Sequence, residues 1–171
     1  KLSFLVGKPG LDGHSNGAEQ IAARARDCGM EIHYDGIRLT PAEIVSAAAE
    51  NQSHVVGLSI LSGSHLPLIA ETMDRMRAAG LDHVPVVVGG IIPEDDAEKL
   101  RAMGVAAVYT PKDFELNRIM LDIVALVDRA PLAAEAPIGA AFEFRTQIVH
   151  FAAEAGDVLA EREVEAPRGA N

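Results

Sequence analysis

Short apolar runs alternate with segments of helical periodicity over the first 130 of the 171 residues, and this alternation constrains the fold more than any other feature. A short apolar run between turn residues is typical of a buried strand, and the repeat predicts a parallel sheet with helices on both faces. The expected strands are Leu2–Val6, Glu31–Tyr34, Val55–Ile60, Val84–Val88 and Ala106–Tyr109. The expected helices are Gly17–Cys28, Pro41–Ala49, Leu66–Ala79, Asp95–Met103 and Phe114–Val127.

Five strands in this pattern favour an α/β fold of the flavodoxin-like (Rossmann-like) class, with strand order 2-1-3-4-5. Ligands of that fold bind beyond the carboxyl ends of the strands, where the strand order reverses. The expected loops at that edge are residues 7–17, 61–65 and 89–93, and all three are rich in Gly or Ser. We therefore expect the functional site at this edge.

Helix boundaries carry capping signals. Thr40 precedes Pro41, which predicts an N-cap followed by proline at the first helical position. Gly29, Gly80 and Gly104 come directly after three expected helices, where a left-handed C-cap is typical.

Composition excludes several partner classes. The formal net charge is −10 and no basic run is present, which argues against nucleic acid and anionic membrane surfaces as partners. No apolar stretch reaches membrane-spanning length. Cys28 is the single cysteine, so no disulfide can form within the chain, and we expect a cytoplasmic location. Because the sequence begins at Lys1 rather than Met, we expect it to be part of a longer protein.

The character of the chain changes near Pro131. Residues 131–171 begin with an Ala/Pro/Gly-rich stretch and end in a polar one, which is typical of a linker and a frayed tail. We expect one domain over residues 1–130 and a tail without an assigned role over residues 131–171.

The first loop combines Lys8, Asp12 and His14 among glycines. A carboxylate two residues before a histidine can fix its tautomer and raise its basicity, as partners of metal-ligating histidines do. Lys8 could then neutralise Asp12. No other histidine has a spacing to His14 typical of a metal pair, so a bound metal would bring its own equatorial ligands, as in a haem or a corrin. The alternatives are an ordinary turn, with Asp12 as a helix cap, His14 as an exposed loop residue and Lys8 as a surface charge.

Three motifs resemble those of cobalamin-binding domains that replace the cofactor's own base with a histidine. These motifs are D-x-H-x-x-G at Asp12–Gly17, S-x-L at Ser59–Leu61, and the pair Gly89-Gly90. The wider context over residues 1–129 is similar to the acyl-CoA mutases of the methylmalonyl-CoA mutase family. The runs "SILSGSH" and "YTPKDF" are more similar to the ethylmalonyl-CoA branch.

The resemblance implies adenosylcobalamin as the cofactor, with His14 as the lower axial ligand of cobalt. Asp12 would hydrogen-bond His14, and Lys8 would be next in that chain. Ser59 would hydrogen-bond the displaced base, and Tyr109 would border the outer end of the nucleotide tail. The further expected cofactor-binding residues are Gly13, Gly17, Gly89 and Gly90, which leave room for the tail, and Leu61, which lines its slot.

The implied function is that of the cobalamin-binding part of an isomerase that rearranges acyl-CoA carbon skeletons by radical chemistry. Its partner would be an acyl-CoA-binding (β/α)₈ barrel, as a domain or a subunit. This chain is too short to contain that barrel, so we expect it to be inactive alone. A homo-oligomer remains open, and a corrinoid carrier for methyl transfer is the alternative. A response-regulator receiver is disfavoured because the third strand ends in "LSIL" without an acceptor Asp.

Overall fold

The computed structural model describes residues 1–10, 16–60, 63, 65–113 and 115–130, with Asp35 described by its backbone only. Over these residues the chain forms a five-stranded parallel sheet in the order β2-β1-β3-β4-β5, which confirms the predicted topology. The strands are β1 (Ser3–Pro9), β2 (Glu31–Leu39), β3 (Val55–Ile60), β4 (Val86–Gly90) and β5 (Ala107–Tyr109). The helices are α1 (Asn16–Asp27), α2 (Pro41–Glu50), α3 (His65–Ala78), α4 (Glu94–Ala102) and α5 (Leu116–Arg129).

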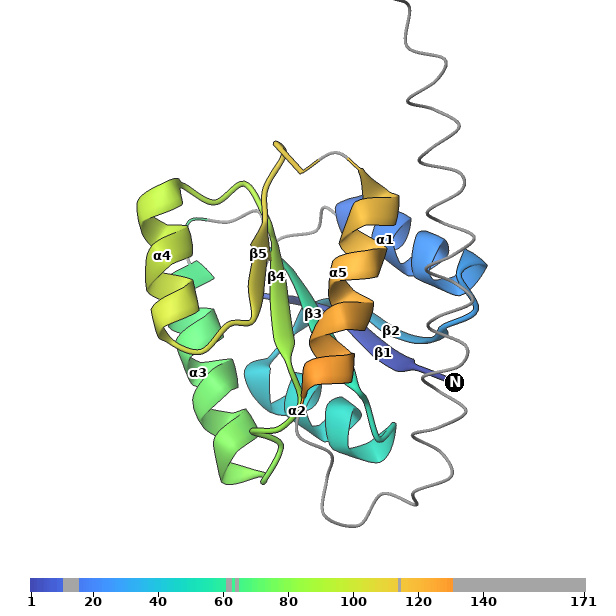
Figure 1. Ribbon diagram of the computed structural model, residues 1–171. Coiled ribbons are helices and arrows are strands. Elements are labelled where there is room, and N and C mark those ends of the chain that lie inside the picture. The colour runs from blue at the N-terminus through green and yellow to red at the C-terminus, as the bar shows by residue number, and fades with distance from the viewer. Residues whose placement is uncertain (11–15, 61–62, 64, 114, 131–171) are drawn as a thin grey trace, which may run out of the picture. The chain divides into compact units, whose positions relative to one another are not determined.

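Helices cover both faces of the sheet. Figure 1 shows α1 and α5 on one side of the strands and α3 and α4 on the other. Strand residues Leu5, Leu58 and Val88 belong to one buried cluster with Ile44 of α2 and Leu100 of α4. The opposite face carries the alternate strand residues, as expected from the two-residue period of a strand. Each face therefore presents its own row of side chains at the carboxyl edge.

β1 and β2 are longer than predicted. β1 continues through Lys8 and Pro9, and every residue of the strand is buried. β2 continues to Leu39 and gains an extra residue opposite β1 between the pairs Val6–Tyr34 and Lys8–Ile37. The prediction that Lys8 belongs to the loop was therefore wrong. Pairing with β2 keeps a charged residue within the sheet, a tertiary effect that local sequence preference does not reveal.

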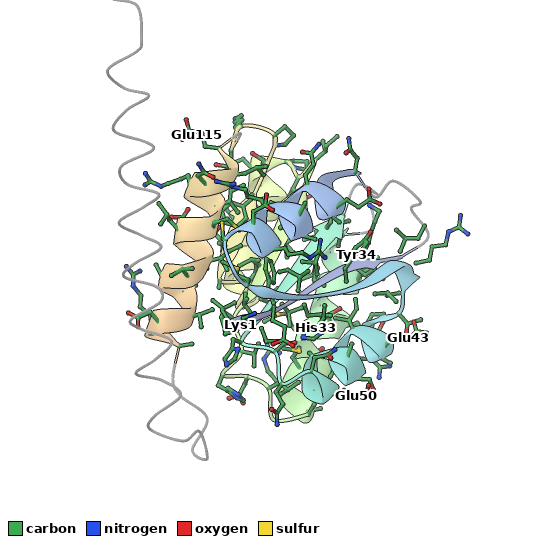
Figure 2. The ribbon with its side chains drawn as sticks, turned by 90° about the vertical axis from the view of Figure 1, so that its right-hand side faces the viewer. Lys1, His33, Tyr34, Glu43, Glu50 and Glu115 are labelled. Atoms are coloured by element: carbon green, nitrogen blue, oxygen red, sulfur yellow. The ribbon has the colours of Figure 1, made fainter. Side chains whose placement is uncertain are left out.

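The two faces of β2 can be followed in Figure 2, where Tyr34 lies on the α1 side of the strand and His33 on the α2 side. The carboxylate of Glu19 in α1 contributes to a raised pKa of Tyr34, after the larger effect of burial, which agrees with this placement. Tyr34 pairs with Val6, so Val6 shares the α1 face. Since alternate residues share a face, Phe4 and Lys8 also lie on the α1 side of β1.

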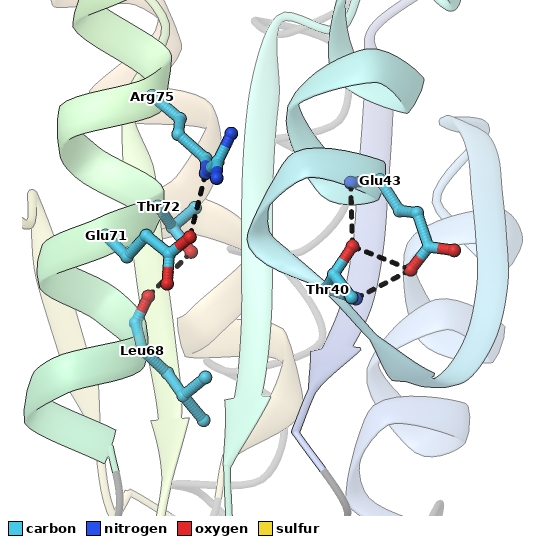
Figure 3. Close-up of polar contacts among 6 residues, drawn as sticks. All are labelled: Thr40, Glu43, Leu68, Glu71, Thr72 and Arg75. Carbon is cyan, nitrogen blue, oxygen red and sulfur yellow. Dashed lines mark hydrogen bonds and ion pairs between the residues drawn. The ribbon is translucent and has the colours of Figure 1, made fainter.

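The predicted helix caps are confirmed. The Thr40 hydroxyl accepts from the Glu43 backbone N–H at 3.2 Å, and the Glu43 carboxylate accepts from the Thr40 backbone N–H at 2.7 Å (Figure 3). This capping box satisfies two donors at the start of α2. Gly29, Gly80 and Gly104 have φ values of 82°, 72° and 104°, as left-handed caps require.

No helix within the described ranges is both long and apolar enough to cross a membrane.

We expect Thr40→Ala to lower the free energy of unfolding by about 1 kcal/mol, because one N-terminal donor of α2 loses its acceptor. Urea denaturation measures this loss. Arg75→Ala is the control, since it removes only the exposed 2.9 Å ion pair with Glu71 on α3 (Figure 3), and such pairs contribute little. Equal losses in the two variants would contradict the role of the cap.

The capping box also predicts a pH dependence. The hydrogen bond from the Thr40 backbone N–H, followed by that from its hydroxyl, lowers the pKa of Glu43 from its ordinary value of 4.5. A lowered folded-state pKa stabilises the fold above the unfolded-state pKa, and this stabilisation is lost as pH falls through the folded-state value. The stability difference between the wild type and Glu43→Gln should therefore be present at pH 7 and shrink below pH 4.5. A difference that stays constant with pH would contradict it.

Candidate functional site

Three residues predicted to bind the cofactor occupy one row across neighbouring strands. Ser59 of β3 pairs with Gly89 of β4, and Gly89 pairs with Tyr109 of β5. Residues in register on adjacent strands point to the same face of a sheet. A Cβ on Gly17 of α1 would lie 3.9 Å from the Ser59 hydroxyl oxygen, so this row faces α1. The structure thus brings Gly17, Ser59, Gly89 and Tyr109 to one side of the carboxyl edge.

Lys8 belongs to the same face and the same edge. Gly7 pairs with Leu58, so Lys8 lies one residue farther along β1, as Ser59 does along β3. Lys8 is 0% exposed, which excludes the alternative that it is a surface charge. A buried ammonium is stable only when it is paired and hydrogen-bonded. The position places a fully buried lysine at the carboxyl end of β1.

Tyr109 carries a polar atom that the fold leaves unused. Its hydroxyl is buried and has no hydrogen-bond partner among the described residues. Burial raises the pKa of Tyr109, and the carboxylates of Asp122 and Asp113 raise it further, so the phenol keeps its proton. Buried hydroxyls are nearly always satisfied, so this one is a candidate donor to a bound molecule.

Strand packing requires glycine at one position of the predicted site, Gly90, but not at Gly17 or Gly89. A Cβ at Gly90 would lie 1.7 Å from the Ile60 carbonyl oxygen, so the close approach of β3 and β4 demands glycine there. Among the residues that the structure describes, a Cβ at Gly17 or Gly89 would meet nothing closer than 3.8 Å. The fold itself would accept alanine at those two positions, so their missing Cβ atoms leave room for something else. Gly89 and Gly90 were predicted in a loop, which is wrong, since they are the last residues of β4.

His65 and Asp96 form a contact that the sequence did not indicate. His65 is the first residue of α3, 5% exposed, and its Nε2 lies 2.9 Å from Asp96 Oδ2 in α4. Asp96 also accepts a 3.0 Å hydrogen bond from Lys99, and the bonds from Lys99 and His65 lower the pKa of Asp96. In the sequence, the one hint of this contact is that α3 and α4 both begin at the carboxyl edge of the sheet.

The turn from β4 to α4 exposes an apolar side chain at the same edge. Ile91 is 67% exposed, whereas the next residue, Ile92, is buried in the core. The only other exposed large hydrophobic residue in the described ranges is Ile37 of β2, at 37%.

Four predicted site residues lie outside the described residues: Asp12, Gly13, His14 and Leu61. Among the residues that are described, no group of three or more His, Cys, Asp and Glu could hold a metal ion.

Comparison with known proteins agrees with this geometry. A family model described as "B12 binding domain" matches residues 2–114. An ethylmalonyl-CoA mutase from Cereibacter sphaeroides is 78% identical over 134 residues, which cover 78% of this chain and 20% of that protein. A second, from Methylorubrum extorquens, is 64% identical over 127 residues, which cover 74% of this chain and 18% of that protein. The chain thus spans about a fifth of the length of these relatives.

A pivalyl-CoA mutase small subunit from Xanthobacter autotrophicus is 46% identical over 110 residues, which cover 64% of this chain and 74% of that protein. Among solved structures, a cobalamin-binding protein from Desulfitobacterium hafniense matches 63% of this chain and 52% of its own, with a TM-score of 0.57 and 24% identity. A Francisella response-regulator receiver domain matches 75% of this chain and 98% of its own, with a TM-score of 0.58 and 15% identity. These two likenesses concern the fold alone. The family match over residues 2–114 shows that the chain belongs to the B12-binding domain family.

Proposed function

We propose that this chain is the cobalamin-binding part of an adenosylcobalamin-dependent acyl-CoA mutase of the ethylmalonyl-CoA type. The observation that carries the proposal is the row of Ser59, Gly89 and Tyr109 facing Gly17 at the carboxyl edge. Identity of 78% to an ethylmalonyl-CoA mutase supports the branch.

The described residues fit such a cofactor. The unpartnered Tyr109 hydroxyl offers a hydrogen bond to the outer end of a nucleotide tail. The space beside Gly17 and Gly89 would be narrowed by any side chain, which suits the close passage of that tail. Ser59, between them, offers a hydroxyl to the displaced base. Gly90 needs no cofactor to explain it, because the contact with the Ile60 backbone already requires glycine at this position.

The remaining roles are assigned to residues around the first turn. His14 would hold cobalt from below, and Asp12 would orient the imidazole through its other ring nitrogen. The buried ammonium of Lys8 would stabilise the carboxylate form of Asp12. Gly13 and Leu61 would line the path of the tail. When bound, adenosylcobalamin supplies the radical chemistry, while the protein supplies binding, orientation and axial-ligand electronics.

Rearrangement of an acyl-CoA also needs a substrate domain. The chain spans a fifth of the ethylmalonyl-CoA mutases but covers 74% of a mutase small subunit, so both one-chain and two-chain arrangements fit. We assign a (β/α)₈ barrel that binds the acyl-CoA as the partner, and expect this chain alone to bind cobalamin without turning over substrate. A cytoplasmic location and a homo-oligomer stay predictions. The likeness to a Methanosarcina barkeri corrinoid protein, at 18% identity and a TM-score of 0.54, concerns the fold only, so the methyl-carrier alternative is less favoured.

The ligand assignment can be tested with hydroxocobalamin. We expect the wild-type chain to give the spectrum of a histidine-ligated, base-off corrinoid and His14→Ala to lose it, because the proposal assigns the cobalt ligand to the His14 imidazole. The matched control is His83→Ala, since His83 precedes β4 at the opposite edge and should leave the spectrum unchanged. A His14→Ala variant that keeps the wild-type spectrum would refute the assignment.

Glycine substitutions test the tail slot separately. Gly17→Ala and Gly89→Ala should leave the stability of the cofactor-free chain within about 0.5 kcal/mol, because the fold accepts a Cβ at both positions. The same substitutions should weaken hydroxocobalamin binding at least about tenfold, because the added methyl group enters space that the tail needs. Titration calorimetry and urea denaturation measure the two effects. Unchanged affinity in both variants would rule out a tail beside these glycines.

A further inference from the structure

The contact between His65 and Asp96 lies at the carboxyl edge that carries the proposed tail slot, on the side of the sheet covered by α3 and α4 (Figure 1). The last residues of β3 and β4 meet in the backbone pairing of Ile60 with Gly90. From there the two strands lead to separate helices, α3 and α4. The 2.9 Å contact between His65 and Asp96 joins the first turns of these helices. The ends of β3 and β4 are thus joined by backbone pairing, and the starts of the helices that follow them are joined by this side-chain contact.

We propose that His65 is a positioning residue for the cofactor: its contact with Asp96 holds the starts of α3 and α4 at the separation that a cofactor bound at the carboxyl edge requires. This inference rests on the proposed function. It assigns to His65 an indirect role, because its side chain is 6% exposed and contacts Asp96 of α4, so it acts through the two helices that this contact joins.

The setting favours a firm contact. His65 is buried, the Asp96 side chain is 22% exposed, and Lys99 donates to the second oxygen of the same carboxylate. A carboxylate in the first turn of a helix is also stabilised by the helix dipole. Asp96 thus stays ionised, and a hydrogen bond to a charged group contributes more than one between neutral groups.

The same two helices offer a matched control at their other ends. Arg77 of α3 donates a 2.9 Å hydrogen bond to the Met103 carbonyl oxygen after α4. Met103 and Arg77 lie near the amino edge of the sheet, away from Ser59 and Gly89. Arg77→Met therefore removes a fastening between α3 and α4 without touching the proposed slot.

The experiment measures the dissociation constant of hydroxocobalamin and the urea stability of the cofactor-free chain for each variant. We expect His65→Ala to weaken binding about tenfold and His65→Gln, whose amide can still reach Asp96, to recover most of that loss. Asp96→Ala should also weaken binding, and the double variant should lose less than the sum of the two single variants, because they share one contact. Arg77→Met should change affinity by less than about twofold.

The outcomes separate the two proposals. An affinity that is unchanged in His65→Ala, or that falls equally in Arg77→Met, overturns the positioning role while wild-type binding upholds the proposed function. If His65→Ala does not fold, the affinities of His65→Gln and Asp96→Asn test the role instead. Near-wild-type affinity in His65→Gln together with weakened binding in Asp96→Asn supports the positioning role. Equal affinities in these two variants overturn it. A wild-type chain that does not bind hydroxocobalamin overturns both proposals.

Discussion

The close approach of β4 to β3 is the constraint on which the rest of the site depends. At Gly90 the backbone of β4 lies against the Ile60 carbonyl so tightly that no side chain fits. This approach fixes the register that places Ser59 beside Gly89, and the next pairing adds Tyr109 to the row. Since all strands are parallel, their carboxyl ends meet at one edge, and the row, the start of α1 and the buried Lys8 are assembled there.

The carboxyl edge combines a buried lysine on β1 with absent side chains at Gly17 and Gly89. The chain carries a formal net charge of −10, yet the Lys8 side chain is completely buried at the end of β1. A buried ammonium is costly unless a carboxylate compensates it, which is the physical reason for pairing Lys8 with Asp12 in the proposed relay. On the adjoining strands the site offers absent side chains and one unused hydroxyl instead. The proposed cofactor, a metal-bound ring with a long tail, would use the buried Lys8 and the absent side chains at Gly17 and Gly89 in different ways.

The sequence predicted the architecture well because periodicity and caps are local properties. Alternating apolar runs gave the strands and their order, and Thr40 and the glycines after three helices marked boundaries that the structure confirms. It failed where neighbouring strands override local preference. Lys8 and Gly90 have the character of loop residues, but pairing with β2 and β3 draws them into the sheet.

For the candidate site, too, local sequence patterns could be predicted and contacts between distant segments could not. The position of Ser59, Gly89 and Tyr109 at the carboxyl edge could be predicted, but the reason for Gly90 could not, because it depends on a backbone contact between two strands. The pair of His65 and Asp96 joins residues 31 positions apart, and no periodicity links them. Asp12, Gly13, His14 and Leu61 lie outside the described residues, so their assignment still rests on sequence.

Electron paramagnetic resonance of the reduced cob(II)alamin complex tests the central claim most directly, using protein in which only the histidine nitrogens carry ¹⁵N. If an imidazole of this chain binds cobalt from below, the nitrogen superhyperfine pattern changes from triplets to doublets on labelling, because the nuclear spin of the ligating nitrogen changes. Triplets that persist in the labelled protein would mean that the cofactor's own unlabelled base remains on cobalt, and the account would be contradicted.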